Sequence, residues 1–531
     1  MPINPASHVI MPNRAVPSLR RRLLPLSAPL VALLAACEDP AGGAPATAQT
    51  CAAPIQLAVG QSADLQADAD GKVRCRIEGS AGSEFVVAFV DTRATQKART
   101  ENEGYGDAFS AYAIAADLSD DVPAPPAPQL PSASVSPGGA PDFDVQNALP
   151  PQGHATYRAT PWTLDERFGV YDGGTQTVRT ARVLRIYGGR YVFAWLEGEN
   201  EPQLAAFMAQ LDSAWAGIVA HGLPLMRAAY SDQDPVTSPG SGQYLVVLRA
   251  IGRGTALGWT VSIPDFGTPR IWTEFKVIPQ ASALRLGEIM AHELAHAFQA
   301  TYMFRTRPAG VTESAAGAAY WGVEGGADLV AFETTRRVAG VPLTANLDMS
   351  AAPASPAARR VAEWGRGHGG ALTNGYADAA GFLRWQAALR VRAGDTEDAA
   401  VTEVLRGASD GWYGFDNGGA RRTGLVERMR SRLDAAWSPE DALLDWALAH
   451  AADDRTTEAR WQDPTYLRVW QGTGGGGGWQ PQSSLPAPGG PAFVSRPYGS
   501  PDYLVIRTDR SEPFAASSSV PGVRWRIVRV R

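Results

Sequence analysis

The sequence predicts a multidomain α+β protein with a β-sandwich-like module at the N-terminus, a central domain of strands followed by helices, and a small β-module at the C-terminus. Residues 84–90 are a short apolar run in a region with few helical patterns, which is typical of a β-sandwich strand. Apolar residues recur at helical spacing from 281 to about 452. Residues 523–531 alternate arginine with apolar side chains, which predicts a strand with one wet face.

Composition supplies the divisions between these parts. Residues 119–153 are dense in Pro, Ala and Ser and predict an interdomain linker, and the glycine run at 474–478 predicts a flexible hinge. A strand pair is expected around Gly188 and Gly189. The predicted divisions are a signal peptide at 1–36, a flexible tether at 37–50, the N-terminal β-module at 51–118, the linker at 119–153, the central domain at 154–455, and a Gly-rich linker with the C-terminal β-module at 456–531.

The N-terminal segment resembles a bacterial lipoprotein signal. Arg20, Arg21 and Arg22 precede an apolar run from Leu23 to Ala36, and small residues stand directly before Cys37. The run is too short and too interrupted by proline to be a spanning helix. The resemblance implies that Cys37 carries the lipid, so that the mature chain is anchored to a membrane of the cell envelope, in the periplasm or at the outer membrane and cell surface.

Removal of residues 1–36 on export changes the net charge of the chain, and the oxidising compartment changes what the remaining cysteines predict. Loss of residues 1–36 removes four Arg and no acid, which leaves 44 basic residues against 54 acidic ones. That acidic balance argues against nucleic acid as a partner. Cys51 and Cys75 are then the pair left after Cys37, and in an oxidising compartment they predict a disulfide, with two buried thiols as the alternative.

The motif that indicates a chemistry is HExxH at 292–296, inside an otherwise uncharged, helix-favouring run. On a helix, His292 and His296 lie on one face and can reach one ion, while Glu293 lies beside the first of them. The pattern predicts one zinc ion and hydrolysis by a zinc-activated water, with Glu293 as general base. Zinc needs at least one further ligand. Gln299 and Tyr302 stand where a metzincin would have Gly and His, which disfavours that class.

Downstream, Glu324 and Asp328 are four residues apart on a second expected helix. With HExxH they make the chain resemble the gluzincins, the thermolysin-like zinc peptidases, and the pattern around Glu324 looks more like the hyicolysin-like branch, over roughly residues 180–450. The resemblance implies a gluzincin-like catalytic domain in which Glu324 is the third zinc ligand and Asp328 hydrogen-bonds His292. Glu313 and Glu333 remain competing ligands.

Two expectations concern the substrate. Residues 272–278 look like an edge strand along which an extended polypeptide would pair, as in gluzincins, and the alternative is a strand paired to its own neighbours. Hydrolysis also needs a donor for the developing oxyanion, for which Tyr376 is the first candidate and His368 the second.

The sequence therefore predicts an exported, lipid-anchored zinc endopeptidase that acts on polypeptides, most simply as a monomer. The alternative is a cell-surface binding or adhesion lipoprotein on a catalytically silent zinc-peptidase scaffold. Retention of Glu293 favours the enzyme, because a binding scaffold has no need of a carboxylate at that place.

Overall fold

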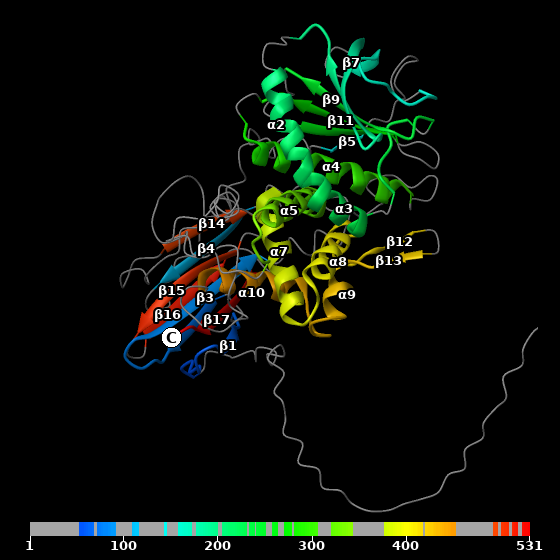
Figure 1. Cartoon of the computed structure of the whole chain (residues 1–531). Coiled ribbons are helices and arrows are strands. Elements are labelled where there is room, and N and C mark those ends of the chain that lie inside the picture. The colour runs from blue at the N-terminus through cyan, green and yellow to red at the C-terminus, as the bar shows by residue number, and fades with distance from the viewer. Residues whose placement is uncertain are drawn as a thin grey trace, which may run out of the picture. The chain divides into compact units, whose positions relative to one another are not determined.

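The computed structural model describes nineteen stretches of the chain, all within one compact unit, Ala41–Arg531. They are residues 53–67, 72–91, 109–115, 143–145, 158–172, 177–199, 204–230, 233–238, 240–250, 258–263, 270–278, 281–305, 320–343, 376–417, 420–452, 492–497, 501–508, 512–518 and 523–531. The protein has the mixed α and β content of a multidomain α+β fold (Figure 1). The predicted signal peptide and tether, with Cys37, lie outside these residues.

A seven-stranded mixed sheet forms one layer of the central domain. Its strands, in spatial order, are β5 (Phe143–Val145), β10 (Gly258–Ile263), β11 (Arg270–Lys276), β9 (Tyr244–Arg249), β8 (Tyr191–Leu196), β7 (Thr177–Tyr187) and β6 (Arg167–Asp172). β8, β9 and β11 run parallel, and the other strands add antiparallel neighbours, except β5, which pairs in parallel with β10. β5 comes from the segment that composition indicated as a linker.

The hairpin of β7 and β8 confirms the predicted strand pair. Gly188 and Gly189 form its turn with φ of 58° and 69°, a backbone region in which a side chain would be strained. The turn residues were therefore recognisable from the sequence.

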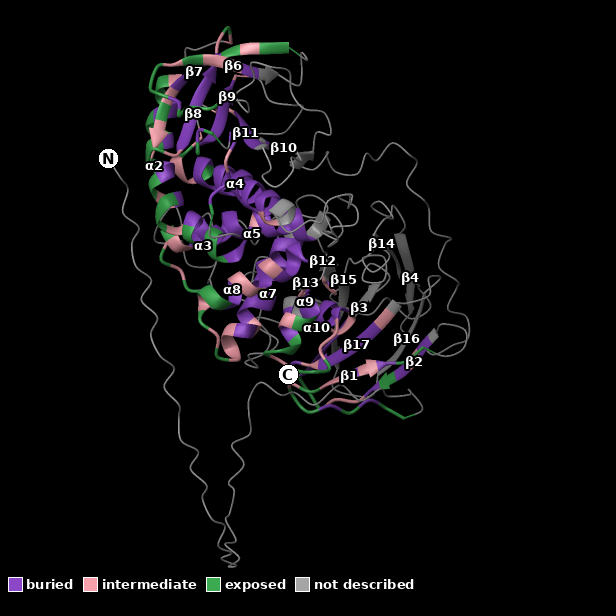
Figure 2. Cartoon of the chain, turned by 90° about the vertical axis from the view of Figure 1, so that its right-hand side faces the viewer, coloured by how far each residue is buried: buried purple, intermediate pink, exposed green. Residues whose placement is uncertain are grey.

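Alternate residues of β8 enter two different apolar cores, as the period of a strand requires. Phe193 and Trp195 face the core shared with the helices, whereas Val192 and Ala194 face a smaller core that includes Trp162. The sheet is thus buried on both faces, which explains why the central strands are apolar almost throughout (Figure 2).

The edge-strand interpretation of residues 272–278 is wrong. β11 lies between β9 and β10 and is hydrogen-bonded to both, so the alternative of a strand paired to its own neighbours holds. The outer edge of β10 is paired with β5 over Thr260–Ser262. Sequence alternation predicted a strand at 272–278, which the structure has at Arg270–Lys276, but could not show which strands flank it.

Among the described residues, helices dominate from 283 to 452, as predicted, and further helices lie between β8 and β9. They are α2 (Leu204–Gly217), a π-helical turn at Ile218–Gly222, α3 (Leu223–Ala229), α4 (Ala283–Arg305), α5 (Tyr320–Val338), α7 (Tyr376–Arg392), α8 (Glu397–Ser409), α9 (Leu425–Arg430) and α10 (Pro439–Ala452), with a small hairpin of β12 (Phe415–Asn417) and β13 (Ala420–Arg422). Thr396 caps α8 by accepting from the amide of Ala399, and Ser438 does the same for Asp441 in α10. No helix of the described residues has the length and apolar character to cross a bilayer.

The N-terminal and C-terminal β-modules, which the sequence predicted as separate, form a single module. Their strands interleave in two four-stranded sheets, β1-β17-β3-β15 and β14-β4-β16-β2, and Val73 of β2 packs with Phe85 of β3 in one core between them. The strands are β1 (Ser62–Leu65), β2 (Lys72–Ile77), β3 (Ser83–Asp91), β4 (Phe109–Ala115), β14 (Ala492–Pro497), β15 (Pro501–Thr508), β16 (Glu512–Ser518) and β17 (Val523–Arg529). Two separate modules were predicted because local patterns do not encode pairing between distant strands.

The sequence predicted that the arginines of β17 lie on a solvent-exposed face, which is wrong for Arg526. Arg526 is 5% exposed and forms ion pairs with Asp64, Asp441 and Asp445, while Trp525 faces the sandwich core. Asp441 and Asp445 belong to α10, which packs against β3 and β17. This face of the strand is therefore covered by a helix.

Cys75 lies buried in β2. Cys51 lies outside the described residues, so the Cys51–Cys75 disulfide stays a prediction.

Candidate metal centre

The HExxH segment lies in the middle of α4, a 23-residue helix that is buried along most of its length (Figure 2). Ser282 begins the helix by accepting from the amide of Arg285, and the uncharged residues around the motif pack against α2, α5, β10 and β11. His292, Glu293 and His296 are 7%, 1% and 0% exposed. Three polar side chains so deeply buried need partners.

Glu324 is brought to these histidines by α5, whose glycines allow close packing of helices. A Cβ on Gly325 would lie 2.4 Å from the Cβ of Ala379 in α7, and one on Gly322 would lie 2.1 Å from the carbonyl oxygen of Ala408 in α8. A Cβ on Gly326 would lie 3.0 Å from Nε2 of Gln299 in α4. Glycine costs a helix about 1 kcal/mol relative to Ala, and at Gly322 and Gly325 it permits approaches that a residue with a Cβ could not make without a shift of the backbone.

The three predicted ligand atoms converge. Nε2 of His292 and Nε2 of His296 are 3.0 Å apart, and Oε2 of Glu324 is 3.5 Å from the first and 3.3 Å from the second. Ligand atoms ~2.0–2.2 Å from one tetrahedral ion are ~3.3–3.6 Å from one another. His292, His296 and Glu324 form a buried group that could hold a metal ion.

The partners of the two Nδ1 atoms determine where the imidazole protons lie. Nδ1 of His292 is 2.7 Å from Oδ1 of Asp328, and Nδ1 of His296 is 2.9 Å from Oε1 of Gln299. Both partners are acceptors, so each Nδ1 carries the proton and each Nε2 presents a lone pair to the other. Two Nε2 lone pairs 3.0 Å apart repel each other unless they share a cation, which is a proton in the metal-free protein and could be a metal ion in the loaded one.

Gln299 is itself fixed in the orientation that this role requires. Its Nε2 donates to the carbonyl oxygen of Val323 at 2.9 Å and to the hydroxyl of Tyr230 at 3.3 Å, which leaves Oε1 directed at His296. From the sequence alone, Gln299 was evidence only against the metzincin class. Its position three residues after His296, on the same helix face, was the signal that could have identified it.

Glu324 has the properties expected of a metal ligand rather than of a structural acid. It is 0% exposed, and neither carboxylate oxygen accepts a hydrogen bond of normal geometry from any described residue. Burial raises the pKa of Glu324, but in the metal-free protein the positive charge of protonated His296 and His292 and their hydrogen bonds outweigh burial and bring the pKa to about 2. A buried, ionised carboxylate with two imidazole lone pairs beside it is a donor set that suits zinc.

The other candidate residues have different places. Glu333 is buried on α5 but paired with Arg336 and Arg337, away from the histidines, whereas Glu313 and His368 lie outside the described residues. Tyr376 is the first residue of α7, which packs against α5. Its side chain is among those the structure does not describe, so its role as oxyanion donor stays a prediction.

Glu293 contacts a strand that the sequence did not connect with the site. Thr260 of β10 lies 2.9 Å from the carbonyl oxygen of Glu293 and 3.1 Å from its Oε2, both measured from the threonine Oγ1. These contacts join residues 33 positions apart, and no local pattern in the sequence indicates them.

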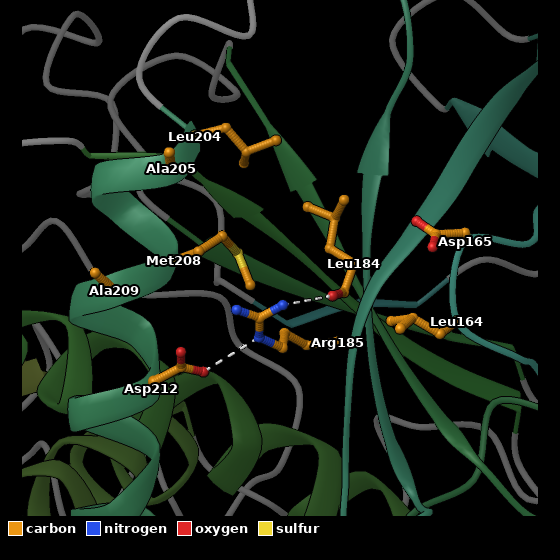
Figure 3. Close-up of a pocket in the computed structure, with 9 residues that line it drawn as sticks. All are labelled: Leu164, Asp165, Leu184, Arg185, Leu204, Ala205, Met208, Ala209 and Asp212. Carbon is orange, nitrogen blue, oxygen red and sulfur yellow. Dashed lines mark hydrogen bonds and ion pairs between the residues drawn. The ribbon is translucent and has the colours of Figure 1, made fainter.

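A separate groove of about 640 Å³ lies between α2 and β7 (Figure 3). Leu164, Leu184 and Met208 contribute its apolar wall, and Arg185 reaches across to Asp212 at 3.4 Å. Because no residue of α4 or α5 lines it, this groove is distinct from the metal centre.

Comparison with protein-family models, curated proteins and solved structures gives no match to this chain.

Proposed function

We propose that the protein is a zinc-dependent endopeptidase. The observation that carries the proposal is the buried convergence of His292, His296 and Glu324, with both Nε2 lone pairs directed inward, next to a buried glutamate that is not part of the donor set. A zinc ion held by these three residues would supply Lewis-acid activation of water and of a carbonyl.

The roles of the chain's own residues follow from their positions. Asp328 and Gln299 hold the imidazoles with Nε2 directed at the centre. Glu293 adjoins His292 in the chain, and we assign to its carboxylate the transfer of a proton from the attacking water to the amine leaving group. Tyr376, at the start of α7, is our candidate for the oxyanion donor, with His368 as the competing one.

We also propose that the chain works outside the cytoplasm as a monomeric lipoprotein with polypeptide substrates. The arginine-led apolar run before Cys37 supports export and anchoring, the acidic balance argues against nucleic acid as a partner, and polypeptide substrates follow from the proposed peptidase chemistry. The Cys51–Cys75 disulfide belongs to the same proposal.

The test compares wild type, Glu293→Gln and Glu288→Gln on unfolded casein, each with and without a chelator. Glu288 is the matched control, because it is buried on the same helix but pairs with Arg285 rather than with the centre. We expect wild type and Glu288→Gln to cleave casein only in the absence of chelator, and Glu293→Gln to bind zinc and not cleave.

Equal cleavage by wild type and Glu293→Gln would contradict the proposal. Zinc binding by wild type without any cleavage would favour the alternative, a binding or adhesion lipoprotein on a silent scaffold.

A further inference from the structure

β10 presents two residues to Glu293. Gly258 and Thr260 are two positions apart in the strand and therefore lie on one face, which meets α4. Oγ1 of Thr260 is within hydrogen-bond distance of both the carbonyl oxygen and the carboxylate of Glu293. A carbonyl oxygen and a carboxylate oxygen accept, so the Thr260 hydroxyl is the donor and its one hydrogen is shared between them.

Two more buried hydroxyl groups, those of Thr273 and Tyr244, continue the hydrogen-bonded chain from Thr260. Oγ1 of Thr273 in β11 is 3.0 Å from Oγ1 of Thr260, and the Tyr244 hydroxyl in β9 is 2.7 Å from Oγ1 of Thr273. Because Thr260 directs its hydrogen at Glu293, it accepts from Thr273, which in turn accepts from Tyr244. Burial raises the pKa of Tyr244, so its phenol keeps the proton that it donates. Chains of this kind strengthen their terminal hydrogen bond.

Gly258 borders the same side chain of Glu293. A Cβ at Gly258 would lie 2.6 Å from Cγ and 2.8 Å from Oε1 of Glu293, closer than side-chain atoms approach one another. The strand therefore leaves space for Oε1 and holds Oε2 by a hydrogen bond.

We propose that Thr260 is the positioning residue for Glu293, which it holds in the orientation needed for proton transfer at the neighbouring metal centre. The inference rests on the proposed peptidase function. A glutamate side chain has three rotatable bonds, so a fixed orientation has to come from its surroundings. Misplacement of a reacting group by about 1 Å can cost on the order of 100-fold in rate.

The test compares Thr260→Val, which keeps the shape and removes the hydroxyl, with Thr260→Ser, which keeps the hydroxyl. We expect Thr260→Val to lower kcat by roughly 10- to 100-fold with KM and zinc stoichiometry unchanged, and Thr260→Ser to retain most of the rate. Thr301→Val is the matched control: Thr301 is also buried, on the same helix as Glu293, and its hydroxyl bonds the carbonyl oxygen of Ala297. We expect its kcat to be unchanged.

Gly258→Ala tests the same positioning without removing a hydrogen bond, and we expect kcat to fall at constant KM. The inference is overturned if Thr260→Val and Gly258→Ala both retain wild-type kcat, or if Thr301→Val loses as much as Thr260→Val does.

A structural measurement separates this inference from the proposed function. Crystal structures of wild type and Thr260→Val are expected to show the Glu293 carboxylate turned away from its wild-type orientation in the variant. An unchanged carboxylate would contradict the positioning role even in an active enzyme. A turned carboxylate in a protein without peptidase activity would support the positioning and refute only the proposed function.

Discussion

Asp328 binds Nδ1 of His292 through its Oδ1 at 2.7 Å, and this contact directs the other imidazole nitrogen at Glu324. Asp328 has no place in the donor triad, yet the lone pair that His292 offers depends on it. The same logic applies to Gln299 and His296, one helical turn away.

Asp328→Ala is expected to weaken zinc binding by about 10- to 100-fold, because the imidazole of His292 loses the partner that fixes its tautomer and ring orientation. Competition with a chromophoric chelator measures the affinity. Asp212→Ala is the control, since Asp212 is half exposed and pairs with Arg185 in the groove on α2. An affinity equal to wild type in Asp328→Ala would show that Asp328 does not orient His292.

Glu324→Ala and Glu333→Ala are expected to fail in different ways. The first removes a member of the buried donor group and should abolish stoichiometric zinc binding in a folded protein. The second removes a partner shared by Arg336 and Arg337, each of which keeps another carboxylate, and should cost about 1–3 kcal/mol of unfolding free energy while zinc content is retained. Metal analysis and chemical denaturation measure the two effects. If Glu333→Ala lost its zinc and kept wild-type stability, the result would contradict the assignment of Glu324 as the ligand and Glu333 as the structural ion-pair partner.

Gly325→Ala is expected to reduce stability by about 1–3 kcal/mol, because the added methyl would overlap Ala379 and force α5 and α7 apart. The shift should also move Glu324 and weaken zinc binding. Gly340→Ala is the comparison from just beyond the same helix, where φ is 66° and nothing lies near an added Cβ; it should lose stability through backbone strain and keep its zinc affinity. Wild-type stability in Gly325→Ala would mean that the helices do not pack as closely as described.

Acid should destabilise the metal-free protein partly through Glu324. The pKa of Glu324 falls from the ordinary 4.5 to about 2 on folding. Its charge therefore stabilises the folded state above pH 4.5, and this contribution is lost as pH falls from 4.5 towards 2. The melting temperature of metal-free wild type should fall more steeply over that pH interval than the melting temperature of metal-free Glu324→Gln. Parallel curves for the two proteins would exclude the effect.

The sequence predicted those parts of the site that depend on spacing along a helix. His292, Glu293 and His296 share one helix, and Glu324 with Asp328 shares another, as the period of 3.6 residues predicted. The choice of Glu324 as third ligand came from the resemblance to the gluzincins and not from the spacing. The same period separates Glu324 from Glu333, because nine residues are two and a half turns and put the two on opposite faces.

The contacts that join distant segments could not be predicted in this way. Thr260 contacts Glu293 across 33 positions, and β17 at the end of the chain lies between β1 and β3 near its beginning. Alternation along a strand shows which face is buried but contains no information on the neighbouring strand. For this reason the predictions of two separate β-modules and of an edge strand were wrong, whereas the helices that contain the motifs were predicted correctly.

Anomalous diffraction at the zinc edge from crystals of the zinc-loaded protein tests the central claim most directly. The account predicts one peak about 2.0–2.2 Å from Nε2 of His292, Nε2 of His296 and Oε2 of Glu324. A fully loaded crystal with no peak between these three atoms, or with zinc bound by other residues, would contradict it.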